Sequence, residues 1–137
     1  MRRFLSGLAG LGLGIAAFGA GACGHCVEDK IAAVYDHGVL TQAATRKHEV
    51  VFFALAGKLV DGEATRQDLE RMAANVPGID KGSVRVSVEN ASLSMAYDPR
   101  ASKLEAIEHD LGRRLARRGL SLGLLRVVDG SGAEVVR

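Results

Sequence analysis

The sequence of 137 residues contains no tryptophan and only two prolines, and aromatic residues make up only 4% of it. Sheets that bind RNA stack bases on exposed aromatic side chains. The strands predicted below at 83–88 and 93–97 offer only Tyr97, so an RNA-binding sheet is excluded. Arg2 and Arg3 account for the whole formal charge of +2, because the 16 acidic residues balance the other basic ones. The chain therefore has no basic surplus that favours nucleic acid as a partner. No Ser/His/Asp arrangement, phosphate-binding loop or paired-carboxylate site is recognisable either.

Residues 1–22 are typical of an export signal. Arg2 and Arg3 precede an uncharged, glycine-rich run, Phe4 to Ala22, that ends in the small residues Ala20-Gly21-Ala22. Cleavage after Ala22 makes Cys23 the first residue of the mature chain. The same residues resemble a degenerate lipobox, in which that cysteine is lipidated, and a retained membrane anchor is the third alternative. All three predict an exported protein, periplasmic or anchored to a membrane.

The sequence that follows predicts one α+β domain. Strands are expected where apolar residues form a short run or alternate with polar ones, and helices where they recur at helical spacing. The predicted elements are a strand at 50–55, a helix at 65–76, strands at 83–88 and 93–97, a helix at 102–118 and a strand at 120–128. This β-α-β-β-α-β order predicts a ferredoxin-like fold, a four-stranded antiparallel sheet with both helices on one face.

Local signals predict where the helices begin. Thr65 with Asp68, and Ser102 with Glu105, have the spacing of capping boxes. Ahead of the domain, Ile31 and Val34 stand at helical spacing and predict an extra helix that begins near Cys26 and continues past Gly38.

The chain is thus expected to have four parts. They are a signal peptide or lipoprotein or membrane leader at 1–22, a CxxC motif with the N-terminal helix at 23–47, the ferredoxin-like domain at 48–129 and a C-terminal tail at 130–137.

Three segments of the domain resemble the heavy-metal-associated (HMA) domains of copper chaperones, mercury-scavenging periplasmic proteins and metal-pumping ATPases. The matching segments are Val76-Pro77-Gly78-Ile79, the strand Val84-Val86-Val88, and Met95-Ala96-Tyr97-Asp98-Pro99. The resemblance implies a ferredoxin-like metal-binding domain, no enzyme activity, and a metal ion and a metal-transporting membrane protein as partners.

One departure from the family concerns its metal loop. In the family a Met-x-Cys-x-x-Cys loop between the first strand and the first helix holds the metal, whereas the corresponding segment here, Gly57 to Glu63, contains no cysteine. The only Cys-x-x-Cys of the chain, Cys23-Gly24-His25-Cys26, lies upstream of the domain. No ligand can therefore be transferred from the family to the loop.

The Cys23-Gly24-His25-Cys26 motif is the main candidate site. Two thiolates at i and i+3 of a helix start converge on one soft or borderline ion, and the positive end of the helix dipole favours the thiolate form. Two ligands complete linear Cu(I), whereas Zn(II) needs two more, for which His25, His37 or His48 are candidates. The hypothesis is that the protein binds or transfers a soft metal ion such as Cu(I), with Cys23, Cys26 and His25 as its metal site.

Two alternatives remain open for the motif. Cys-Gly-His-Cys is also the tetrad of protein disulfide isomerases, although this chain lacks the tryptophan before the motif and the strand that precedes it in thioredoxin-like folds. The pair can also form a simple disulfide, or Cys23 can carry a lipid in a non-catalytic interaction domain.

Other candidates are interpreted as structural or solvated. His37 and His48 are expected to be solvated, His109 to lie on the surface and Met95 to pack in the core. The cluster Arg113, Arg114, Arg117 and Arg118 is expected to be a solvated helix end.

Overall fold

The computed structural model describes residues 22–136, and within 22–26 it describes the backbone alone. The predicted leader therefore lies outside the described residues. The elements are α1 Ala22–Ala33, α2 His37–Arg46, β1 Glu49–Gly57, α3 Glu63–Ala74, β2 Arg85–Ser87, β3 Ser92–Tyr97, α4 Leu104–Ala116 and β4 Leu120–Asp129. Over 22–136, every helix falls short of the length and apolar character that a membrane span requires.

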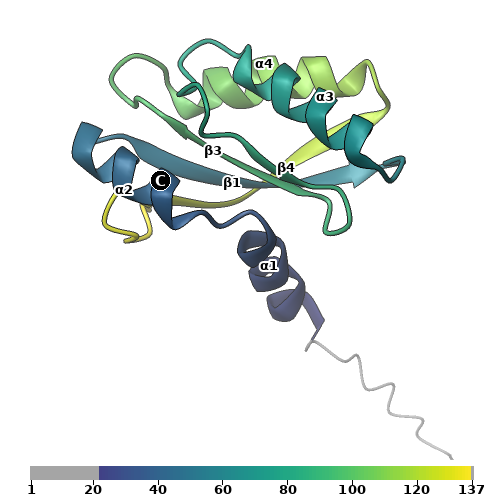
Figure 1. Ribbon diagram of the computed structural model, residues 1–137, viewed down its shortest axis with the longest axis horizontal. Coiled ribbons are helices and arrows are strands. Elements are labelled where there is room, and N and C mark those ends of the chain that lie inside the picture. The colour runs from purple at the N-terminus through teal and green to yellow at the C-terminus, as the bar shows by residue number, and fades with distance from the viewer. Residues whose placement is uncertain (1–21, 137) are drawn as a thin grey trace, which may run out of the picture.

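The four strands form one antiparallel sheet in the order β2-β3-β1-β4. Helices α3 and α4 lie side by side over one face of this sheet (Figure 1). The element order from β1 to β4 with this strand order is the ferredoxin-like arrangement, so the predicted fold class is confirmed.

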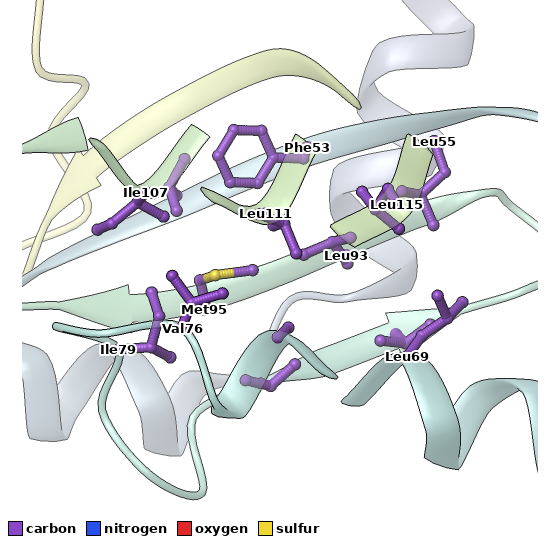
Figure 2. Close-up of a cluster of buried hydrophobic side chains, with 14 of the residues drawn as sticks. Phe53, Leu55, Leu69, Val76, Ile79, Leu93, Met95, Ile107, Leu111 and Leu115 are labelled. Carbon is purple, nitrogen blue, oxygen red and sulfur yellow. The ribbon is translucent and has the colours of Figure 1, made fainter. Parts of the chain in front are cut away.

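The larger hydrophobic core lies between the sheet and helices α3 and α4. Alternate residues of β1 and β3 point into it and meet the apolar stripe of α4, as Figure 2 shows for Phe53, Met95 and Leu111. Met95 is fully buried there, as predicted. This core holds the two helices against the sheet.

A second core covers the opposite face of the sheet. Helices α1 and α2 lie on that side (Figure 1), and their side chains pack against Phe52, Val50 and Val128 of β1 and β4. Ser83 and Ser87, on the polar face of the strand predicted at 83–88, are buried as well. The alternating pattern predicted that only one face of the sheet is covered, whereas the N-terminal helices cover the opposite face as well.

The N-terminal helix is two helices rather than one. Asp36 adopts an extended conformation between α1 and α2, and its carboxylate accepts a hydrogen bond from the Val39 N–H at 3.1 Å, so it caps α2. The Arg85 Nε donates to the same carboxylate at 2.8 Å and ties the cap to β2. The continuous helix predicted past Gly38 is wrong, because this cap starts a new helix at His37.

Both predicted capping boxes are wrong. The residue before α3 is Gly62 and the residue before α4 is Lys103, and neither makes a side-chain cap hydrogen bond. Thr65 lies inside α3, because Glu63 already starts the helix and accepts from Arg66 one turn later. The Ser102 hydroxyl donates instead to the Pro77 carbonyl at 3.4 Å, which joins the two loops that follow α3 and β3.

Adjacent phenylalanines of β1 test the two-sided packing. Phe52 faces α1 and α2, Phe53 faces α3 and α4, and both are buried. We expect Phe52→Ala and Phe53→Ala each to lower the free energy of unfolding by about 3–5 kcal/mol in urea denaturation. Val60→Ala, at an exposed loop position, serves as the control and should change it by less than about 0.5 kcal/mol. A near-neutral Phe52→Ala contradicts the second core.

The Asp36 cap makes the free energy of unfolding depend on pH in the acid range. The Val39 N–H and then the Arg85 side chain hold the pKa of Asp36 below its ordinary value of 3.8. Its contribution is therefore present above the unfolded-state pKa and is lost as the pH falls through the lower folded-state pKa. Because asparagine caps as well as aspartate, we expect Asp36→Asn to cost about 0.5 kcal/mol at pH 7 and less in acid. Thermal unfolding across the acid range checks this, with Asp61→Asn as control; a pH-independent difference contradicts it.

Candidate functional site

The Cys-x-x-Cys motif lies in the first turns of α1. Helix α1 spans Ala22–Ala33, so Cys23 and Cys26 stand three positions apart on a helix, as the sequence predicts. The side chains of Cys23, His25 and Cys26 lie outside what the structure describes. Their role as metal ligands therefore stays a prediction. The side chains of α1 are described from Val27 onward, and these show how the helix is held.

Helix α1 is attached to the sheet by an apolar stripe and by hydrogen bonds. Ile31 and Val34 are buried in the second core, and Val27 packs against it. The Ser94 hydroxyl of β3 donates to the Val34 carbonyl at 2.7 Å. The attachment of α1 therefore begins at Val27, the residue after Cys26.

Lys30 joins α1 to the turn between β2 and β3. Its Nζ donates to the Asn90 carbonyl at 2.5 Å and to the Ala91 carbonyl at 3.3 Å. Ala91 has a positive φ of 48°, and its carbonyl also accepts from the Leu55 N–H at 2.8 Å. Lys30 thus gives a donor to the Asn90 carbonyl and a second donor to the Ala91 carbonyl, at the end of the sheet where β1 finishes.

A pair of charged residues joins α1 to β4. Arg126 Nη2 donates to the Glu28 Oε1 at 2.5 Å, and Arg126 Nε lies 3.8 Å from the Glu134 Oε2. The hydrogen bond from Arg126 lowers the pKa of Glu28, and the same contact raises the pKa of Arg126. Glu28 and Arg126 are 98 positions apart, so no local pattern in the sequence signals this contact.

A cavity of ≈ 610 Å³ lies between α1, α2, the end of β4 and the segment after it. Phe52 and Val128 are apolar and buried on its wall, and Tyr35, His37 and Arg126 line it as well. The predicted solvated His37 is exposed. The cavity exists because two helices of different direction leave a gap over the sheet, a feature that periodicity cannot show.

His48 is not solvated, contrary to expectation. Its side chain is only 12% exposed, and its Nδ1 lies 2.7 Å from the Asp80 Oδ2 while its Nε2 lies 3.6 Å from the Asp98 Oδ2. The two carboxylates belong to the loops after α3 and β3, which converge on the start of β1. Both nitrogens of His48 therefore face carboxylates of the domain, which leaves this residue poorly placed as a ligand for the motif.

The loop between β1 and α3 occupies the place of the family's metal loop. Its residues, 58–62, are mostly exposed and contain no cysteine. Where α3 begins, the hydrogen bond from Arg66 lowers the pKa of Glu63 to about 2. Among the residues whose side chains are described, no three His, Cys, Asp or Glu side chains are arranged to hold a metal ion.

The basic end of α4 is partly paired. Arg113 and Arg114 both contact Asp110, and Arg118 contacts Asp68 of α3. Arg117 is exposed, and so is His109, as predicted. The cluster is thus a helix end stabilised by ion pairs as well as by solvent.

No protein-family model matches the chain, and no curated protein matches it. Several solved structures are similar to it, three of which follow. The copper binding domain from HMA7, a P-type ATPase, is 19% identical, and the match covers 64% of this chain and 99% of that one with a TM-score of 0.45. Oxidized MerP from Ralstonia metallidurans CH34 is 16% identical, with coverages of 55% and 93% and a TM-score of 0.42. The apo N-terminal domain of the zinc(II) ATPase ZiaA is 19% identical, with coverages of 56% and 97% and a TM-score of 0.43. At such identities the likeness concerns the fold alone.

The Lys30 contacts predict how firmly α1 is attached. Lys30→Met removes both hydrogen bonds to the turn and keeps the aliphatic stem, so we expect about 1 kcal/mol less stabilisation of the docked helix. That corresponds to roughly fivefold faster hydrogen exchange of the α1 amides, measured by mass spectrometry. Lys58→Met, in the exposed loop, should leave this exchange unchanged. Equal exchange in the two variants contradicts the contact.

Proposed function

We propose that the chain is an exported protein that binds a soft metal ion, Cu(I) in the first place, through Cys23 and Cys26 for storage or transfer. The observation that carries the proposal is the position of the only two cysteines, at i and i+3 in the first turns of a helix that is attached to a ferredoxin-like domain. Helix starts favour thiolates, and thiolates select soft ions.

The spacing favours Cu(I) over Zn(II). Two thiolates complete a linear Cu(I) site, whereas Zn(II) needs four ligands. His25 is the nearest further donor, but helical geometry rotates position 25 by about 200° from position 23, away from the face that the cysteines share. His48 is engaged by Asp80. The pair of thiolates therefore forms the site by itself, with His25 at most a donor from the other side of the helix.

The docking of α1 gives the site a fixed base. Cys26 precedes Lys30 by one helical turn, and Lys30 is held by the carbonyls of the turn between β2 and β3. Cys26 also precedes Val27, which packs against the second core. A helix held at these points gives the motif a fixed attachment to the domain.

The proposal includes export through the leader at 1–22. Cleavage before Cys23 leaves both thiols free, whereas a lipid on Cys23 removes one thiolate and with it the metal pair. The mass of the N-terminal peptide from the exported protein distinguishes these states, and a diacylated Cys23 contradicts the metal site.

Titration of the reduced protein with Cu(I) against a chelator tests the binding. We expect one Cu(I) per chain, and at least about a 100-fold loss of affinity in the Cys23→Ser/Cys26→Ser variant, because even changes outside the ligand shell cost roughly 10- to 100-fold. His25→Ala, in the same helix, should retain nearly full affinity. Unchanged affinity in the double variant refutes the proposal, and disulfide reductase activity of the wild type without Cu(I) binding favours the oxidoreductase alternative.

A further inference from the structure

Strand β4 forms one edge of the sheet, and only half of this edge is covered. Beyond Leu125 the segment after β4 folds back along it: the Val135 N–H donates to the Val127 carbonyl at 2.8 Å, and Val128 forms a bridge with Glu134. Over the described residues 22–136, no backbone bridge reaches the outer side of Leu120–Leu125. In this six-residue stretch of an edge strand, the N–H and C=O groups of alternate residues therefore point outward with no strand beside them.

The uncovered half lacks the features that usually protect an edge. Natural edge strands carry charges or proline, or are very short. The segment Leu120-Ser121-Leu122-Gly123-Leu124-Leu125 has neither charge nor proline, and Leu124 is 47% exposed. Its single irregularity is the register shift opposite Phe52 and Phe53, which falls at the covered end of the segment. The segment is thus suited to pair with another strand.

We propose that this segment pairs with the same segment of a second copy of the chain, antiparallel and related by a two-fold axis, so that two sheets join into one. Pairing of a strand with itself across such an axis is self-complementary, and since all six residues are uncharged, no like charges meet. A charged partner segment would find no opposite charge on these six residues.

Charges just outside the segment fit the same arrangement. In antiparallel register, the residues before Leu120 of one copy approach the residues after Leu125 of the other. Arg117, exposed at the end of α4, is then brought toward the other copy's Glu134, whose side chain is 65% exposed beside β4. Opposite charges at both ends of the paired segment set the register and orientation of the two copies.

The expected association is weak. Pairing of six residues buries less than the roughly 1,600 Å² of a standard protein interface. The dimer should therefore form at micromolar concentrations or above, which permits exchange of partners. It would place two α1 helices on one continuous sheet.

Sedimentation velocity of the full chain in reducing buffer, over a range of concentrations, tests the pairing. Leu124→Lys and Ser121→Lys place an ammonium on the edge at exposed positions, so both should fold and weaken the dimer by at least about tenfold. Val60→Lys makes the same change at an exposed apolar residue of the loop after β1 and should dimerise as the wild type does. A wild type that stays monomeric at millimolar concentration, or equal association of all four proteins, overturns the proposal.

Discussion

Strand β1 is buried on both of its faces, and each face needs its own cover of helices. Phe53 and its alternate neighbours require a cover of α3 and α4, and Phe52, Val50 and Val128 require a second cover on the other side. A βαββαβ unit supplies only the first cover. The two N-terminal helices supply the second, and α1 and α2 are therefore part of the folded unit rather than a tether in front of it.

This requirement explains why the Cys-x-x-Cys motif can form a site at the start of α1. A short isolated helix is marginal in water, but α1 is held by the second core, by Ser94 and by Lys30. The cysteines stand in its first two turns, directly before Val27, where these contacts begin. The loop after β1, where the resembled family keeps its thiolates, contains no cysteine, and the site that we propose lies on a helix at the opposite face of the sheet.

The fold was largely predictable because the signals for it are local and periodic. The apolar run of β1, the alternation in β3 and the stripe of α4 each specify an element and the face that it buries. The capping boxes failed because a three-residue spacing of polar side chains is common: α3 starts two residues earlier, at Glu63, where Arg66 can pair with it. The covered second face was missed because alternation reports which residues are apolar, and serines such as Ser94 are buried through hydrogen bonds to the helix above them.

The sequence could predict the residue types of the candidate site but not the contacts that position them. Two cysteines three apart identify a thiol pair, but the contacts that position α1 come from Ser94, Asn90 and Arg126, which are 60 or more positions away from their partners. His48 shows the same limit, since its carboxylate neighbours come from two other loops.

NMR titration of the reduced, isotope-labelled protein with Cu(I) shows where on the chain the ion binds. If the ion binds at the start of α1, amide shifts should be largest from Cys23 to Ile31 and should extend to the turn at 89–91 through Lys30, while residues 58–62 stay unchanged. Shifts confined to residues 58–62, or none at equimolar Cu(I), would contradict the assignment of the metal site to α1.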